Sequence, residues 1–578
     1  MTPLEHTQRW LQARRYTPEK LAAARRALEE VRAGANVLDA IRRNPLPEGG
    51  HPGKHMLVAV YRQLVESGEW QPDPALLARI RMKPTRTLSG VTTVTVLTKP
   101  YPCPGKCIFC PTDVRMPKSY LPDEPGAMRG LQHEFDPYAQ VQARLRSLAA
   151  VGHPVNKIEL LVLGGTWSAY RRDYREWFIH RCFDALNGVD SETLEAAQHR
   201  NETAEHRNVG LVVETRPDHI TPREIEHMRR LGVTKVQLGA QSLDDRILAL
   251  NQRGHSVDDT RKAVALLRAA AFKVVLHWMP NLLGATPESD REDFARLWST
   301  NRHEWARIGP RMGTNRHEWA RIGPRMGTNG HEWARMGALA PDELKIYPTQ
   351  LLANADLYAY WQRGEYQPYD TETLVDLLAE VKTTIPRYCR VNRVIRDIPS
   401  TNVVEGNKRT SLRQDVHREM ARRGTHCQCI RCREVRGQKV VPDTLRFDDL
   451  TYRAGFAEEH FLSFDTPEDK LAGFLRLSLP GEASPDLGFA DLEGAALIRE
   501  VHVYGQSLEV GREEQGAAQH IGLGRQLIAR AEEIARSRGY RRLAVIAAVG
   551  TRRYYAARGF RMGDLYMVKE LPGRELRS

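Results

Sequence analysis

The chain has 578 residues, several times the length of a typical domain of about 100 to 200 residues, so we expect more than one hydrophobic core. Hydrophobic residues make up 41% of the chain and charged residues 27%, a balance that excludes disordered and fibrous proteins. No run of 18 apolar residues is present, and residues 1–15 lack the apolar segment of a signal peptide. We therefore expect a cytoplasmic multidomain protein with no membrane partner.

The net charge of +13 is concentrated in two segments that are far apart in the sequence. Residues 1–87 contain 15 Lys and Arg against 9 Asp and Glu, and residues 396–440 contain 11 against 5. A surplus in two distant segments indicates a long polyanion such as RNA rather than a small anion in one pocket. Ordinary solubilising surfaces are the alternative interpretation.

Two amphipathic patterns, at residues 18–43 and 54–68, are separated by a Pro- and Gly-containing break and predict a small helical module over residues 1–87. From residue 88, short runs of Val, Ile and Leu alternate with helical patterns, which predicts a parallel α/β sheet or partial barrel over residues 88–395. The strands predicted there are residues 91–97, 158–163, 209–213, 235–238, 273–276 and 344–346.

A tandem repeat interrupts this predicted barrel domain. The fourteen residues 300–313 recur unchanged at 314–327, and a degenerate copy follows at 328–337. We interpret residues 300–338 as a surface insertion that arose by duplication of a coding segment. A basic, Trp-bearing loop that contacts RNA is the alternative.

A basic, cysteine-bearing linker is predicted over residues 396–442, followed by an independent α/β domain over residues 443–578. The C-terminal domain is predicted from apolar strand patterns and one long helix between them. The strands are expected near residues 471–477, 495–503 and 543–547, and the helix at 522–537.

Three cysteines directly follow the first predicted barrel strand with the spacing C-x3-C-x2-C, namely Cys103, Cys107 and Cys110. Three thiolates on one short loop can hold three irons of a four-iron, four-sulfur cluster and leave the fourth iron open. A zinc site would need a fourth ligand from elsewhere in the fold. The isolated Cys182 and Cys389 are expected to be small buried hydrophobic residues.

This loop resembles that of the radical S-adenosylmethionine (SAM) enzymes, in which the open iron binds the amino and carboxylate groups of SAM. Several further motifs end predicted strands, at the face where barrel enzymes assemble their sites. By this resemblance, the SAM-binding residues are Gly164, Gly165, Thr166, Glu214 and Gln241.

The C-terminal domain contains a second motif, because residues 519–524 fit Q-x-x-G-x-G at the start of a helix. Glycines at that position let the backbone approach a pyrophosphate, whose charge the helix N-terminus favours. With Tyr554 and Tyr555 downstream, the pattern resembles GNAT-type acetyltransferases, in which a strand backbone pairs with pantetheine and a tyrosine stands at the thiolate leaving group. We assign that role to Tyr555, because a phenol can donate a proton to a developing thiolate.

A second cysteine cluster lies in the basic linker, where Cys427, Cys429 and Cys432 have the spacing C-x-C-x2-C. Three close thiolates need one more ligand to complete a structural zinc tetrahedron, and His417 or His426 is expected to supply it. A second iron–sulfur cluster is the alternative.

The order of these parts resembles the family of the catalytic third subunit of Elongator, the tRNA uridine(34) acetyltransferases, in its bacterial single-chain form. The resemblance spans residues 10–572 and includes HCQCIRCREVR at 426–436, ELKIYPTQL at 343–351 and VGTRRYYAARGF at 549–560. It implies that an adenosyl radical takes hydrogen from the methyl group of acetyl-CoA, and that the resulting carbon radical adds to C5 of the wobble uridine. The implied cofactors are the iron–sulfur cluster, SAM, acetyl-CoA and zinc.

The same resemblance assigns acetyl-CoA contacts and two catalytic residues, Lys157 and Tyr555. The contacts are Lys157, Glu500, Val501, His502, Val503, Gly522, Leu523, Gly524, Arg525 and Tyr555. For Lys157 alone, the residue pattern favours an ordinary surface lysine at the end of a strand. The first loop departs from the eukaryotic members, whose first cysteine lies farther from the second.

The two basic segments are expected to bind the phosphates of a tRNA anticodon stem-loop while the target base turns out into the site. A homodimer is left open, and the electron donor is unknown. One alternative function is a radical SAM RNA methyl- or methylthiotransferase with an independent lysine acetyltransferase domain. The other is an RNA-binding scaffold with a degenerate radical site.

Overall fold

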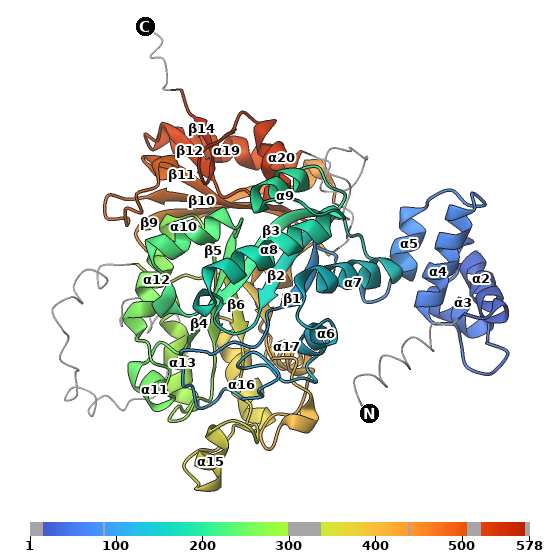
Figure 1. Ribbon diagram of the computed structural model, residues 1–578, viewed down its shortest axis with the longest axis horizontal. Helices are drawn as coiled ribbons and strands as arrows, with labels where there is room; N and C mark the ends of the chain where they lie inside the picture. The colour runs from blue at the N-terminus through green and yellow to red at the C-terminus, as the bar shows by residue number, and fades with distance from the viewer. Residues whose placement is uncertain are drawn as a thin grey trace.

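The computed structural model describes residues 16–84, 87–298, 337–436, 438, 440–505 and 522–572. A helical lobe near the N-terminus is set apart from a body that contains two sheets (Figure 1). The predicted insertion, up to residue 336, and residues 519–521 of the glycine motif lie outside the described residues. Within the described ranges, no helix is long and apolar enough to cross a membrane.

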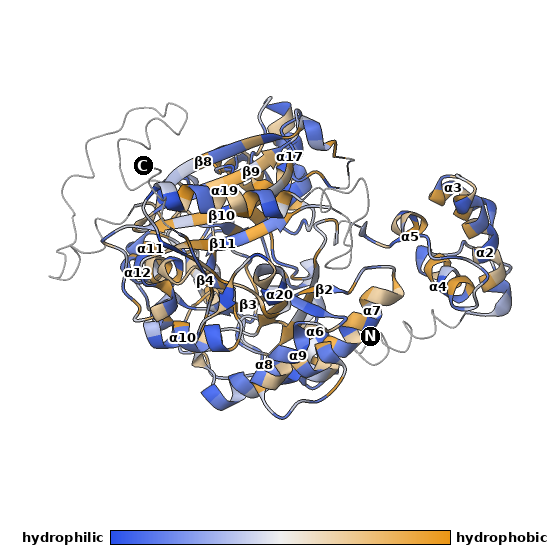
Figure 2. Cartoon of the chain, turned by 90° about the horizontal axis from the view of Figure 1, so that it is seen from above, coloured by the Kyte–Doolittle hydropathy of each residue, from blue (hydrophilic) through white to orange (hydrophobic). Residues whose placement is uncertain are grey.

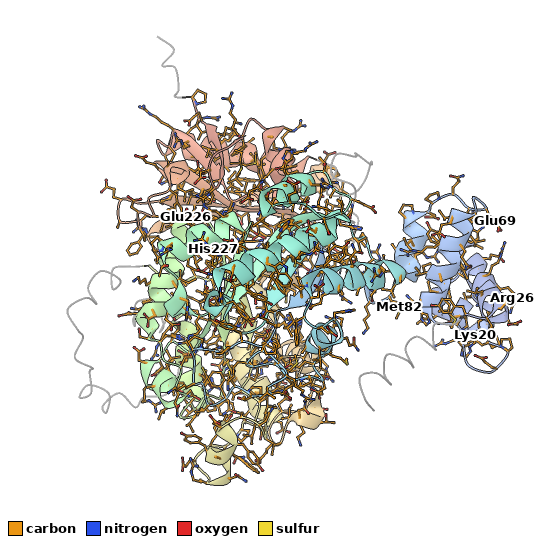
Figure 3. All side chains as sticks on the ribbon, in the orientation of Figure 1. Lys20, Arg26, Glu69, Met82, Glu226 and His227 are labelled. Carbon is orange, nitrogen blue, oxygen red and sulfur yellow. The ribbon has the colours of Figure 1, made fainter. Side chains whose placement is uncertain are left out.

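The N-terminal lobe has its own hydrophobic core, formed by residues such as Leu28, Val31 and Leu57. The helix predicted over residues 18–43 is two helices, because Gly34 adopts a φ of 107° and Asn36 caps a new helix. The lobe meets the body beside Met82 (Figure 3), whose backbone amide donates to the Val151 carbonyl at 3.2 Å. Its helices are α2 (Pro18–Arg32), α3 (Val37–Arg43), α4 (Lys54–Glu66) and α5 (Pro74–Ile80).

The first sheet is a half-barrel of seven parallel strands in sequential order, each paired with the next along the chain. This confirms the predicted partial barrel and its first six strands. The strand that the sequence did not predict is β7, which has only four residues and one buried position. The strands are β1 (Thr92–Leu97), β2 (Lys157–Leu163), β3 (Arg207–Thr215), β4 (Lys235–Gln241), β5 (Lys273–Trp278), β6 (Glu343–Ile346) and β7 (Arg390–Arg393).

The two faces of this sheet differ because side chains alternate along a strand. In β2, Ile158, Leu160 and Val162 are buried under the surrounding helices, whereas Lys157 and Glu159 face the interior of the half-barrel. The associated helices are α6 (Pro125–Gln132), α7 (Pro137–Ala150), α8 (Arg172–Asn187), α9 (Leu194–Asn201), α10 (Pro222–Arg230), α11 (Asp245–Leu250), α12 (Val257–Ala269), α13 (Pro287–Ala295), α15 (Leu357–Gln362), α16 (Thr371–Val381), α17 (Leu412–Arg422) and α18 (Ile430–Arg433).

The second sheet is mostly antiparallel, with one parallel pair between β11 and β12. Hydrophobic stretches run along β9, β10 and β11 (Figure 2), and α19 packs against these strands. Strands β8 and β9 were not predicted. The elements are β8 (Arg446–Ala454), β9 (Ala457–Asp465), β10 (Leu471–Pro480), β11 (Ala495–Val503), α19 (Leu523–Ser537), β12 (Arg542–Val545), α20 (Arg552–Ala556), β13 (Arg561–Met562) and β14 (Met567–Glu570).

A buried network of ion pairs joins the two sheets. Asp342, just before β6, accepts from Arg499 of β11 at 2.5 Å, and the same guanidinium is 3.0 Å from Glu459 of β9. Arg268 of α12 lies 3.2 Å from Glu459, and Arg476 of β10 lies 3.5 Å from Asp342. All five side chains are at most 2% exposed. Although burial opposes ionisation, the three arginines hold the pKa of Asp342 far below its usual value.

We predict that Asp342→Ala lowers the free energy of unfolding by about 3–5 kcal/mol, because it leaves buried arginines without their partner. Asp564→Ala is the matched control, since Asp564, between β13 and β14, also pairs with the first domain, through Arg230 of α10 at 3.0 Å, but is 68% exposed. That control is expected to cost less than about 1 kcal/mol. Equilibrium urea unfolding measures both variants, and equal losses would contradict the assignment.

Candidate functional site

A cavity of about 2240 Å³ lies inside the half-barrel and is closed on one side by the second sheet. Cys110 of the first cysteine loop and Gln241 at the end of β4 line it near the carboxyl ends of the strands. Lys157 and Lys273, the first residues of β2 and β5, line it near the opposite ends, together with Val501 of β11. The cavity, called the chamber below, therefore runs along the length of the half-barrel.

The first cysteine loop brings three thiols next to the side chains of two arginines. Cys107 and Cys110 are hydrogen-bonded to each other through their sulfur atoms. Arg253 donates to the Cys107 sulfur at 3.3 Å, and Arg216 lies against Gly105 of the loop. The Cys110 thiol and Arg253 lower the pKa of Cys107 to about 5, whereas Cys107 and burial raise the pKa of Cys110. Cys107 is therefore the thiol of this pair that most readily forms the thiolate needed to bind a metal.

The glycine turn after β2 supports this loop. Gly164 has a φ of 141°, and a Cβ atom there would lie 1.7 Å from the Thr98 hydroxyl oxygen, so only glycine fits. The Thr166 hydroxyl lies 3.6 Å from the Cys103 sulfur. The structure thus brings Thr166 to the cysteine loop, while Gly164 and Gly165 shape the turn that carries it.

Two further predicted SAM residues, Glu214 and Gln241, line the chamber. Gln241 adopts a left-handed φ of 70°, and its buried side-chain oxygen has no hydrogen-bond partner among the described residues. An unsatisfied buried oxygen costs about 1–3 kcal/mol, so this position fits a ligand that donates a hydrogen bond. The amino group of SAM has that chemistry.

Three residues of the chamber wall that were given no individual role from the sequence form a polar cluster beside Glu214. His277 of β5 lies 3.2 Å from the Gln237 side-chain oxygen, and Lys345 of β6 donates to the same oxygen. Burial and Lys345 hold the pKa of His277 well below its usual value, so the imidazole is neutral at physiological pH. Alternating polar residues in otherwise apolar strands are the sequence signal that could have identified them.

The second sheet opens where pantetheine is expected. Strand β11 pairs with β12 only over Ala495–Ile498, so among the described strands none pairs with residues 499–503 on that side. The register with β10 shifts between Arg476 and Leu477, which leaves Arg499 as an extra bulged residue. The bulge and the early end of β12 expose backbone amide and carbonyl groups towards the chamber.

The glycine turn at the start of α19 lies beside this opening. Gly522 is the N-terminal cap, with a φ of 72°, and Gly522, Gly524 and Arg525 line the chamber. A Cβ atom on Gly524 would come within 2.5 Å of the Tyr554 hydroxyl oxygen. A larger residue at this position would therefore narrow the space between the turn and Tyr554. The Leu523 side chain is buried in the core, so its backbone is the part available to a ligand.

The predicted catalytic pair, Lys157 and Tyr555, lines the same chamber. Tyr555 is 7% exposed, and burial raises its pKa well above the usual range, which keeps the phenol protonated. Glu500 is held by Lys273 and Arg476, each at 3.0 Å, so it contributes to a ligand site chiefly through its backbone.

Comparisons with known proteins place these observations in one family. The Radical SAM superfamily model matches residues 101–297, the Radical_SAM C-terminal domain 341–422 and the acetyltransferase (GNAT) family 431–560. A "tRNA uridine(34) acetyltransferase" of Dehalococcoides mccartyi is 41% identical over 85% of this chain and 99% of that protein. The human "Elongator complex protein 3" is 34% identical over 86% of this chain and 87% of that protein.

A solved structure agrees with these relatives. The archaeal Methanocaldococcus infernus Elp3, lacking residues 1–46, matches with a TM-score of 0.67 and 35% identity over 83% of this chain and 99% of that chain. This chain belongs to the tRNA uridine(34) acetyltransferase family. The predicted family, the half-barrel and the GNAT domain are therefore confirmed. Radical SAM membership implies an iron–sulfur cluster and SAM, and GNAT membership implies acetyl-CoA.

The linker of this family member gathers its own cysteine triad. The sulfur atoms of Cys427, Cys429 and Cys432 lie within 4.8 Å of one another, and the last two are 3.7 Å apart. This spacing fits one tetrahedral ion, for which about 3.8 Å is expected. His417 of α17 lies 3.9 Å from the Cys432 sulfur, whereas His426 is exposed. Of the two predicted fourth ligands, the geometry favours His417.

Proposed function

We propose that this chain modifies C5 of the wobble uridine of tRNA, using SAM radical chemistry and acetyl-CoA as the source of a carboxymethyl-type group. The observation that carries this proposal is the shared chamber, whose wall includes both Cys110 and Tyr555. Relatives named tRNA uridine(34) acetyltransferase and Elongator complex protein 3 support the substrate. A methyltransferase with an independent lysine acetyltransferase domain would not need one chamber for both sites.

At the end of the chamber near the first cysteine loop, we propose that the chain binds the cluster and orients SAM. Cys103, Cys107 and Cys110 would hold the cluster, which together with SAM would supply a radical able to take hydrogen from an unactivated C–H bond. Arg216 and Arg253 compensate the negative charge of the thiolates. We propose that Thr166, Glu214 and Gln241, with the glycine turn, orient SAM.

At the GNAT end, the open backbone of residues 499–503 is proposed to pair with pantetheine, and the turn at Gly522–Arg525 to hold the pyrophosphate. Tyr555 would donate its phenolic proton to the coenzyme A sulfur as a water molecule adds to the thioester carbonyl and the C–S bond breaks, which leaves a carboxyl group and the free thiol. The acetyl methyl group would then point along the half-barrel towards Cys110, away from bulk water. This arrangement lets one chain deliver the acetyl group directly to the radical site.

Arginines of β7 and of the linker form a basic wall that we propose contacts tRNA. Arg393, Arg396, Arg413, Arg431 and Arg436 line the chamber. Burial and the nearby Arg431 lower the pKa of Arg413 to about 10, a crowding of cations that phosphate groups would relieve. We propose that these arginines and the basic lobe over residues 1–87 bind the anticodon stem-loop, with domain limits at residues 88, 396 and 443.

The proposal is tested with anaerobically reconstituted protein, SAM, reductant, tRNA and acetyl-CoA deuterated at the methyl group. We expect mass spectrometry to find deuterium in 5′-deoxyadenosine and in a uridine that carries a two-carbon unit. Unlabelled 5′-deoxyadenosine together with unmodified tRNA would contradict the proposed hydrogen source and the proposed function.

Lys157 makes acetyl-CoA binding depend on pH. Burial and Arg207 lower its pKa to about 8, so its cation, and its attraction for the anionic coenzyme, is lost as the pH rises through that value. We predict that acetyl-CoA affinity falls about tenfold between pH 7 and 9.5, consistent with loss of a charged contact of about 1.5 kcal/mol. Lys157→Arg, which stays charged, should abolish this fall in calorimetric titrations. An unchanged pH dependence would exclude Lys157.

We further propose that Cys427, Cys429, Cys432 and His417 hold one structural zinc ion. The matched pair of variants is His417→Ala, near the thiolates, and His426→Ala, exposed on the same segment. After dialysis against a chelator, metal analysis should find zinc lost from His417→Ala and retained by wild type and His426→Ala. Loss from His426→Ala alone would reverse the assignment, and iron in place of zinc would support a second cluster.

A further inference from the structure

Four aromatic side chains form a continuous run between α8 and the first cysteine loop. The ring centroids are 4.8 Å apart for Tyr101 and Tyr170, 5.3 Å for Tyr170 and Tyr174, and 5.6 Å for Tyr174 and Trp177. Tyr101 lies two residues before Cys103, and Trp177 is 44% exposed. The run therefore leads from the protein surface to the cysteine loop.

This run lies outside the chamber, because none of its four side chains is part of the chamber wall. The cysteine loop therefore has two sides. Cys110 lines the chamber, whereas Cys103 follows Tyr101 and Pro102 on the outer side, where Pro102, Pro104 and Lys106 are exposed. The outer side is the one that a protein partner can approach while the substrates occupy the chamber.

Exposed cations lie on the segments that carry the run. Lys99 lies 4.7 Å from the centre of the Tyr174 ring, and Arg171 and Arg172 are 74% and 54% exposed. Asp173 and Glu176 pair with these two arginines, so the surface keeps a net positive charge through Lys99 and Lys106. We call this surface the outer patch; it comprises Lys99, Tyr101, Lys106, Arg171, Arg172 and Trp177.

We propose that the outer patch is the docking site of the electron donor, a small acidic electron-transfer protein that carries a reduced flavin or iron–sulfur centre. This inference rests on the proposed radical function. In the step, the donor loses one electron and the cluster at the cysteine loop gains it, and no covalent bond forms or breaks. An exposed tryptophan amid cations suits a small, transient interface that electrostatics steer. The packed rings form an uninterrupted path through the protein between that interface and Cys103, along which the electron can pass.

The test uses the reconstituted holoenzyme and a bacterial flavodoxin as the donor. The variants are Trp177→Ala and the double variant Lys99→Glu, Arg171→Glu. The matched controls are Phe447→Ala and Arg446→Glu on β8, where Phe447 is 39% exposed and Arg446 is exposed. Binding is read from line broadening of 15N-labelled flavodoxin, and electron transfer from 5′-deoxyadenosine formed with reduced flavodoxin or with dithionite.

We expect the outer-patch variants to bind flavodoxin at least tenfold more weakly and to form 5′-deoxyadenosine at least tenfold more slowly with it. Dithionite-driven formation should be unchanged, because the small reductant needs no docking site. Unchanged flavodoxin binding by the outer-patch variants would overturn the proposal, and so would an equal loss of binding in the β8 controls. A variant that binds flavodoxin normally but binds tRNA more weakly would also overturn it. A parallel loss with dithionite would assign the rings a structural role. Failure of wild type with both reductants would instead overturn the proposed function.

Discussion

The buried network around Asp342 and Glu459 determines how the two catalytic domains meet. Its three arginines come from α12, β10 and β11, and its two carboxylates from the residue before β6 and from β9. A buried ion network adds less stability than its contact distances suggest, because desolvation opposes it, but a wrongly docked arrangement would leave charges unpaired. Arg499 reaches the network from the bulge in β11 that also opens this strand towards the chamber. The same local irregularity thus joins the domains and opens the strand at the proposed acetyl-CoA site.

The chamber follows from this docking. Strands of a parallel sheet are usually apolar on both faces, yet the inner face of this half-barrel carries charged residues. Lys235 pairs with Glu159 at 2.7 Å and with Glu343 at 3.1 Å, and Lys273 pairs with Glu500 of β11. In these pairs each charged side chain is neutralised by a partner on the wall of the half-barrel, so the wall stays polar and leaves room for substrates. An apolar interior would have filled the barrel with side chains.

Much of this could be predicted from the sequence, because the deciding signals were local. Six strands of the half-barrel carry apolar runs, and each cysteine triad lies within a segment of eight residues or fewer. What was missed depends on distant contacts. Strand β7 is short, and β8 is largely exposed and polar, so neither has a hydrophobic signature. Asp342 and Glu459 are 117 positions apart, and nothing in the sequence around either residue indicates that the fold buries both. The pairing of His417 with the second triad likewise required the turn after α17.

We propose that the acetyl group and the radical meet inside one chain. The most direct test mixes two variants, Cys107→Ala, which lacks a cluster ligand, and Tyr555→Phe, which lacks the proton donor for coenzyme A, with tRNA, SAM, acetyl-CoA and reductant. The account predicts that mass spectrometry finds no more modified uridine in the mixture than the sum of the separate variants. Product approaching the wild-type level would show that an acetyl-derived intermediate passes between molecules, which would contradict a shared chamber.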